Sequence, residues 1–252
     1  MKKVIVSNKG EGIVEIKLNR PEIRNAIDLE VMDKLSKAIK EIKADRTIKG
    51  VIITGEGERA FCSGGDLSVF HQLTTQEAAY EMLSKMGNIL YEWMLLPQPT
   101  FALLNGTAVG GGCEIATACD FRIAKESISV GFIQGTLAIT TGWGGASMLY
   151  EKLPYDKALT MLLSAKKYTA EEAYQLGFIS KLVSEKNFYN EGYQFIKETI
   201  QCNAEVLRAY KQIKISEWEN GLKEKMKKEI LRCSVLWEKE EHINAVNHFL
   251  NS

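Results

Sequence analysis

A run of three glycines leading into an apolar, helix-forming segment is the feature that most limits how this chain can fold. The run is Gly110-Gly111-Gly112, followed by Cys113-Glu114-Ile115-Ala116. Such a turn leaves the N–H groups at the helix N-terminus without intrahelical partners. These donors and the positive end of the helix dipole favour an oxygen that gains negative charge, and Glu114 is then a candidate acid or base beside it. The glycines would equally suit a turn that serves only close packing.

A second glycine-containing turn follows another predicted strand. The β-branched run Val51–Gly55 predicts a buried strand, and Ala60–Leu67 after it contains Gly64 and Gly65. A further predicted strand, Pro99–Gly106, leads into the triple glycine. Two turns of this kind, each with free donors and no bulky side chain, would clamp one oxyanion between them.

At this point the chain resembles a known family, the enoyl-CoA hydratase/isomerase family or crotonase superfamily. The likeness extends to about Val183, and its motifs are specific in combination. In chain order they are Asn19–Ala26, Ala60–Leu67, Asn105-Gly106 through Gly110–Glu114, Cys119–Ala124, Gly142-Trp143-Gly144-Gly145, Ser164–Ala173 and Leu176–Ser180.

The resemblance implies which residues would bind an acyl-CoA thioester. The backbone N–H groups of Gly65 and Gly111 would polarise the thioester carbonyl and hold the enolate formed from it. Coenzyme A would enter only as part of the substrate, along the backbone around a set of substrate-binding residues. These residues are Ile23, Arg24, Ser63, Asp66 and Leu67, and Trp143 is a further substrate-binding candidate. Arg24 would meet a CoA phosphate or, alternatively, be a solvated surface arginine.

The second catalytic carboxylate of the family is missing. Hydratases of this family use a glutamate at the position of Glu114 and another twenty residues later, where this chain has Gln134. Glutamine cannot exchange a proton near neutral pH. Because general acid–base catalysis contributes about 100- to 10,000-fold, an ordinary hydratase should suffer from this change. The isomerases of the family generally rely on the same second carboxylate, so Gln134 counts against them as well.

Decarboxylation of a malonyl-type thioester needs the oxyanion hole but no base, because carbon dioxide leaves in place of a proton. The segment from Ala118 to Gly145, including Trp143, is similar to the methylmalonyl/ethylmalonyl-CoA decarboxylase branch. We therefore favour a decarboxylase of short alkylmalonyl-CoA. Two alternatives stay open: an enoyl-CoA hydratase or isomerase with Glu114 as sole acid/base, and a catalytically silent acyl-CoA binder. Trp143 would also suit a purely structural role as a buried aromatic residue.

Composition excludes several other classes of function. The chain has 252 residues, no net charge and no long basic run, which argues against nucleic-acid binding. No apolar stretch approaches the roughly 20 residues that span a bilayer, and the N-terminus lacks a signal-peptide core. Five scattered cysteines are typical of a reduced, cytoplasmic protein, and three isolated histidines make a metal site improbable.

The expected fold is α/β, a crotonase-like (ClpP/crotonase) spiral of strand–strand–helix units with a helical C-terminal region. Strands are predicted at 4–6 and 13–18, a helix after its cap Asp28, and another from its cap Thr75 to about Leu96. We divide the chain into an acyl-CoA-binding core, 1–183, and a C-terminal region, 184–252, whose helices pack on their own core or on a neighbouring subunit. From the resemblance we expect a homotrimer or a dimer of trimers. Residues considered for the acyl pocket are Met86, Ile89, Leu90, Leu137 and Trp143, with Trp237 and Phe249 as further wall candidates.

Overall fold

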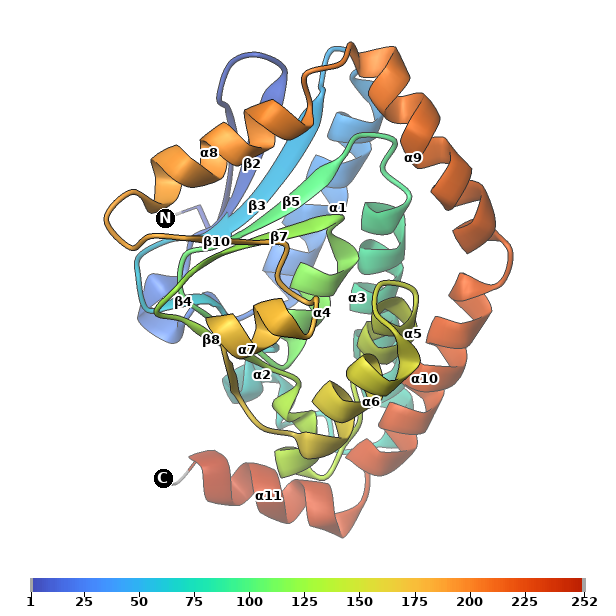
Figure 1. The fold of residues 1–252 in the computed structure, drawn as a ribbon. Helices are drawn as coiled ribbons and strands as arrows, with labels where there is room; N and C mark the ends of the chain where they lie inside the picture. Colours follow the sequence, from blue (N-terminus) through green and yellow to red (C-terminus); the bar gives the residue numbers. More distant parts are fainter. Residues whose placement is uncertain (1, 251–252) are drawn as a thin grey trace.

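The computed structural model describes residues 2–250 and contains two sheets surrounded by helices (Figure 1). The larger sheet has the strand order β1-β2-β3-β5-β7-β10, and the smaller has the order β4-β6-β8-β9. β1 pairs antiparallel with β2 and β8 with β9, whereas the other neighbours run parallel. The strands are β1 (Val4–Asn8), β2 (Ile13–Leu18), β3 (Gly50–Gly55), β4 (Ala60–Cys62), β5 (Thr100–Leu104), β6 (Thr107–Val109), β7 (Phe121–Lys125), β8 (Ser129–Gly131), β9 (Tyr168–Thr169) and β10 (Lys181–Val183).

A strand–strand–helix unit repeats along the chain, as the sequence predicts. In the first unit β1 and β2 both belong to the large sheet and lead to α1, whereas later units have one strand in each sheet before the helix, as in β3-β4-α2 and β5-β6-α4. The helices are η1 (Pro21–Ile23), α1 (Leu29–Ala44), α2 (Leu67–Phe70), α3 (Gln76–Met94), α4 (Gly111–Ala118), η2 (Ile133–Leu137), α5 (Gly145–Tyr150), α6 (Tyr155–Ser164), α7 (Ala170–Gln175), α8 (Phe188–Thr199), α9 (Ala204–Glu219), α10 (Leu222–Trp237) and α11 (Glu240–Leu250).

Local sequence signals explain the two long helices of the core. Asp28 and Thr75 accept hydrogen bonds from Val31 N and Ala78 N, so both predicted N-caps of α1 and α3 are confirmed. α3 ends at Met94, just before the prolines that stop it. Both helices belong to the main hydrophobic core, which lies against one face of the large sheet.

The C-terminal helices pack on the rest of the described chain. α8 covers the other face of the large sheet, where Phe188, Ile196 and Ile200 join a second apolar cluster (Figure 1). α10 runs along α3, and its residues Met226 and Ile230 belong to the main core. The division at 183/184 stays a prediction, but α10 clearly contributes to the core of residues 1–183. Between residues 2 and 250, no helix combines the length and apolarity needed to cross a bilayer.

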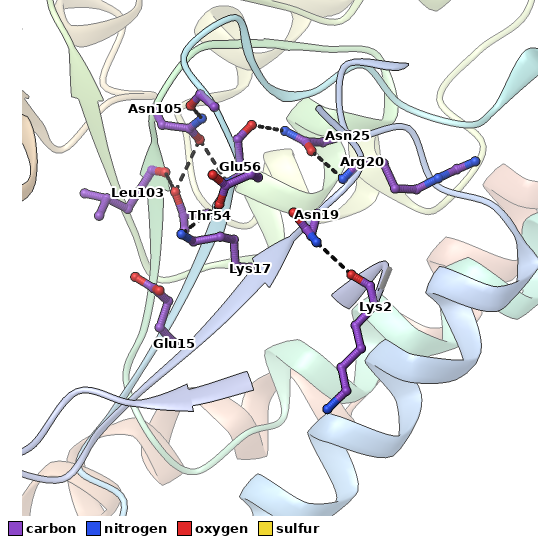
Figure 2. A network of polar contacts seen from close by, with 12 residues as sticks. Lys2, Glu15, Lys17, Asn19, Arg20, Asn25, Thr54, Glu56, Leu103 and Asn105 are labelled. Atoms are coloured by element: carbon purple, nitrogen blue, oxygen red, sulfur yellow. Dashed lines mark hydrogen bonds and ion pairs between the residues drawn. The ribbon is translucent and has the colours of Figure 1, made fainter. Parts of the chain in front are cut away.

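Two buried asparagines fix the loop that follows β3. Asn105 accepts from Gly55 N at 2.9 Å and donates to Gly57 O at 2.7 Å. Asn25 donates to the carbonyl oxygens of Glu56 and Ala60 (the Glu56 contact is drawn in Figure 2). Because these amides satisfy backbone groups that no strand pairs, the loop enters β4 and the Gly64-Gly65 turn in a defined direction.

Candidate active site

A cavity of about 130 Å³ lies where the turn after β4, the start of α4, η2 and α10 meet. Its wall is mostly apolar, and among the described residues it includes no lysine, arginine or histidine. The lining residues are Ser63, Gly64, Gly65, Leu67, Phe70, Met82, Leu83, Gly110, Gly111, Glu114, Ile133, Gln134, Thr136, Leu137, Ile139, Thr140, Gly142, Trp143, Cys233, Trp237 and Phe249.

Two residues that line this cavity, Gly65 and Gly111, come from adjacent turns. Among the hydrogen bonds of residues 2–250, none is donated by the N–H of Gly65 or Gly111. Gly111 is the first residue of α4, so its N–H belongs to the unpaired first turn. The turns are close together, since a β-carbon on Gly64 would lie 2.9 Å from Gly111 N. This arrangement suits an oxyanion, as the two glycine-rich turns predict.

The indole of Trp143 packs against both glycines. A β-carbon on Gly111 would come within 2.2 Å of Trp143 Cζ3, and one on Gly65 within 3.6 Å of Cζ2. A side chain at 111 is therefore excluded while Trp143 keeps its place. The ring occupies the space into which a side chain would project, and all three residues still line the cavity.

Glu114 is buried, and its carboxylate accepts hydrogen bonds from four donors. Oε2 accepts from the N–H groups of Trp143 and Gly145, both at 2.8 Å, and Oε1 from Gly142 N at 3.3 Å and Gln134 Nε2 at 2.9 Å. Burial and the negative charge of Glu229 raise the pKa of Glu114 to about 8, against the backbone donors, which lower it. Both protonation states are thus accessible near neutral pH.

Gln134 lies beside Glu114, at the place given by counting along the sequence. It is 8 % exposed on η2, and its amide donates to Glu114. Its carbonyl oxygen Oε1 is buried and has no hydrogen-bond partner among the described residues. Gln134 therefore leaves one buried acceptor unsatisfied in the described structure, whereas a glutamate would place a titratable group there.

Glu229 on α10 is a carboxylate near the site that the sequence analysis missed. Its Oε1 accepts from Thr141 Oγ1 at 2.5 Å and Ala146 N at 3.0 Å, and its Oε2 from Ser147 N at 2.7 Å. Burial raises its pKa above that of an ordinary glutamate. No local pattern marks this residue, because α10 carries many charged residues and only its packing selects this one.

The other predicted substrate-binding residues are divided between the cavity wall and the surface. Ser63 and Leu67 line the cavity. Asp66 does not; it caps α2 through Ser68 N and pairs with Arg20 at 3.0 Å. Ile23 and Arg24 lie on and just after η1, both exposed and outside the cavity. Whether Asp66, Ile23 and Arg24 touch coenzyme A stays a prediction.

Only some of the residues that the sequence suggested for the acyl pocket line the cavity. Leu137, Trp237 and Phe249 line the cavity, together with Trp143. From α3, however, Met82 and Leu83 form the wall, whereas Met86, Ile89 and Leu90 belong to the hydrophobic core. In residues 2–250 no group of three or more His, Cys, Asp or Glu side chains is arranged to hold a metal ion.

Known proteins resemble this chain over most of its length. Residues 8–251 match the family model described as enoyl-CoA hydratase/isomerase. An ethylmalonyl-CoA decarboxylase of Xenopus tropicalis is 32 % identical over 93 % of this chain and 79 % of its own length. A short-chain-enoyl-CoA hydratase of Clostridium acetobutylicum is 33 % identical over 81 % and 77 %, respectively.

A solved structure supports the fold as well. An enoyl-CoA hydratase from Bacillus anthracis superposes with a TM-score of 0.81 and 27 % identity, covering 99 % of this chain and 96 % of that one. The family resemblance and the crotonase-like fold predicted from the motifs are thus confirmed. This chain belongs to the enoyl-CoA hydratase/isomerase family, the crotonase superfamily.

Proposed function

We propose that the protein decarboxylates short alkylmalonyl-CoA thioesters. The observation that carries the proposal is Gln134, which stands 2.9 Å from Glu114 where a hydratase of this family has its second glutamate. Glu114 is then the one carboxyl group in the described cavity wall, so a water there cannot be activated by two carboxyl groups. Among the relatives, ethylmalonyl-CoA decarboxylases are similar over most of this chain.

The charges of the cavity fit loss of carbon dioxide. A malonyl-type carboxylate bound there would meet no cationic side chain of the described wall, and it would lose hydration to an apolar lining. When the bond between the α-carbon and the carboxylate breaks, its electron pair enters the thioester enolate and neutral carbon dioxide leaves. The negative charge thereby moves to the oxygen near Gly65 N–H and Gly111 N–H, which become its hydrogen-bond donors.

The enolate must then gain a proton at its α-carbon. Glu114 is the only carboxyl group among the described lining residues, and with its pKa raised to about 8 by burial and by Glu229 it is mostly protonated at pH 7. Glu114 would donate this proton to the α-carbon and be reprotonated from solvent. The acyl group should be short, because Leu83, Met82 and Phe70 close a cavity of only about 130 Å³.

An enoyl-CoA hydratase that uses Glu114 as sole acid/base is the second candidate. It is favoured by the position of Glu114 in the cavity wall and by its accessible protonation states. The relatives named hydratases support it as well. The third candidate is a catalytically silent protein that binds acyl-CoA, for which binding without turnover is expected.

The test is to assay purified protein with crotonyl-CoA for hydration, by absorbance, and with methylmalonyl- and ethylmalonyl-CoA for decarboxylation, by mass spectrometry. We expect decarboxylation without hydration, and its loss by about 100-fold or more in Glu114→Gln. Glu77→Gln, an exposed position on α3, is the matched control and should behave as wild type. Substantial hydration would overturn the decarboxylase proposal, and binding without turnover would favour the silent binder.

We further propose a homotrimer or a dimer of trimers in the cytoplasm. Several large apolar side chains are exposed on helices at the surface, including Tyr155, Leu163 and Tyr210. Light scattering after gel filtration should give at least three times the 28.3 kDa of one chain. The free thiols of Cys62, Cys113 and Cys119 support a reducing compartment.

A further inference from the structure

We propose that Glu229 is a positioning residue of this site. Glu229 and Glu114 accept hydrogen bonds from neighbouring backbone N–H groups around the start of α5, and Glu229 thereby helps to hold Trp143 against Gly65 and Gly111. The inference rests on the proposed use of the cavity by an acyl-CoA thioester. It concerns a different part of the chain, however, because Glu229 comes from α10 and does not line the cavity.

Glu114 and Glu229 accept hydrogen bonds from different backbone N–H groups around the start of α5. Glu114 accepts from Trp143 N and Gly145 N, whereas Glu229 accepts from Ala146 N and Ser147 N. The contact with Glu114 is close, since a β-carbon on Gly145 would lie 2.4 Å from Glu114 Cγ. The backbone that carries Trp143 is therefore held by hydrogen bonds to Glu114 of α4 on one side and to Glu229 of α10 on the other.

The hydroxyls of this segment strengthen the attachment to α10. Thr141 Oγ1 donates to Glu229 at 2.5 Å and accepts from Ala146 N at 3.2 Å. Ser147 Oγ donates to Glu229 at 2.6 Å. Glu229 thus accepts two backbone and two hydroxyl hydrogen bonds, and hydrogen bonds to a charged group contribute more than neutral ones.

α10 itself is held firmly enough to serve as a support. Met226, Ile230 and Cys233 are buried, at most 3 % exposed, in the core that α10 shares with α3. Glu229 stands between these residues, so its carboxylate has a fixed origin relative to the cavity. The adjacent turn of α10 also reaches the cavity through Cys233.

A purely structural cap would not act on the chemistry of Glu114, but Glu229 does so through its charge. After burial, the carboxylate of Glu229 is the largest influence raising the pKa of Glu114. The other titratable groups around the two carboxylates are the thiols of Cys113 on α4 and Cys233 on α10 and the phenol of Tyr150 on α5. The described residues that donate to either carboxylate include no cation to offset this repulsion.

Removing the charge of Glu229 should therefore make Glu114 ionise at lower pH. Glu229→Gln preserves the size of the side chain and can still accept from Ala146 or Ser147. We expect the alkaline limb of the decarboxylation rate, which reports protonated Glu114, to move to lower pH. Glu224→Gln, an exposed position on the same helix, is the matched control and should leave the profile unchanged.

A second readout keeps the inference testable if the protein proves not to decarboxylate. The tryptophan fluorescence of Trp143, taken as the difference between each protein and its Trp143→Phe counterpart, is followed against pH. The pH at the midpoint of this fluorescence change should be lower in Glu229→Gln than in the wild type, and it should be unchanged in Glu224→Gln. Glu229→Ala, which also removes the hydrogen bonds, should weaken the binding of butyryl-CoA about tenfold by calorimetry while the circular dichroism spectrum is retained.

These measurements distinguish the positioning role of Glu229 from the proposed decarboxylation. An unchanged fluorescence midpoint in Glu229→Gln, with unchanged butyryl-CoA binding in Glu229→Ala, would overturn the positioning role whatever the reaction is. Absence of decarboxylation, with a shifted midpoint and weakened binding, would instead overturn the proposed reaction and leave the positioning role standing.

Discussion

Replacing Gln134 by glutamate should extend the pH dependence of the protein's stability to higher pH. In the wild type, Gln134 Nε2 lies 2.9 Å from Glu114 Oε1, so Gln134→Glu would bring two carboxylates to that separation. Two unit charges at 2.9 Å repel each other by ~6 kcal/mol at an effective dielectric constant of about 20. Ionising both groups in the folded protein is therefore strongly unfavourable, and the pair should keep a proton at pH 7.

The sign of the effect follows from proton counting. An ordinary glutamate in the unfolded chain loses its proton near a pKa of about 4.3, so above that pH the folded variant holds one proton more. The free energy of unfolding should then fall by about 1.4 kcal/mol per pH unit as pH rises, and this fall should continue above pH 8, where Glu114 of the wild type has ionised, until the folded pair ionises. The wild type itself should lose stability from about pH 4.5 to 8, because the folded pKa of Glu114 is raised to about 8 by burial and by Glu229.

Urea denaturation at pH 5, 7 and 9 measures this difference directly. Gln134→Met is the control, because it removes the hydrogen bond to Glu114 without adding a charge, and its profile should run parallel to that of the wild type. Parallel profiles for Gln134→Glu and the wild type would refute the reasoning, since the two carboxyl groups would then not share a proton. In the assay, the same substitution should raise the hydration of crotonyl-CoA, since it restores the second glutamate.

Three further substitutions test other parts of the structure. Gly111→Ala puts a methyl group 2.2 Å from Trp143 and should destabilise the protein by ~1–3 kcal/mol in urea. The loss should be smaller in a Trp143→Phe background, and an equal loss would contradict the contact. Leu83→Ala should improve kcat/KM for longer alkylmalonyl-CoA substrates relative to Leu90→Ala, which is buried on α3 outside the cavity; equal preferences would argue against Leu83 as the limit. Arg20→Ala leaves Asp28 and Asp66 without their shared partner and should cost ~3 kcal/mol at pH 7. Burial tends to raise the pKa of Asp28, but Lys3, Val31 N–H and Arg20 hold it below its usual value, so the stabilisation by Arg20 should vanish as pH falls below about 4.

The parts of the fold that depend on local chemistry could be predicted from the sequence. Asp28 and Thr75 cap their helices because a side-chain oxygen before an apolar periodic run satisfies N–H groups of the first turn. The neighbouring positions of Glu114 and Gln134 followed from a count without gaps, which holds because the strands and turns between them match the family pattern.

What depends on the packing of distant segments could not be predicted. Glu229 reaches the start of α5 only because α10 crosses both α3 and α5, and no pattern on α10 distinguishes this glutamate from its exposed neighbours. The helical period of α3 indicates which residues share a buried face, but not that the cavity opens at Leu83 rather than at Met86. The position of Asp66 outside the cavity wall could not be predicted for the same reason, since its ion-pair partner Arg20 is distant in sequence.

The position of α10 has a consequence for how the protein is made. A ribosome releases the N-terminal part of a chain first, so the sheets and α3 emerge well before Leu222–Trp237. Until then, the face of α3 around Gly87, which lies against Ile230 of α10, is open to water, and the segment bearing Trp143 lacks its hydrogen bonds to Glu229. The nascent chain therefore carries an apolar strip and an unfinished cavity until synthesis is almost complete. A chain cut short before α10 should retain every strand of both sheets, bind chaperones through this strip and hold no acyl-CoA.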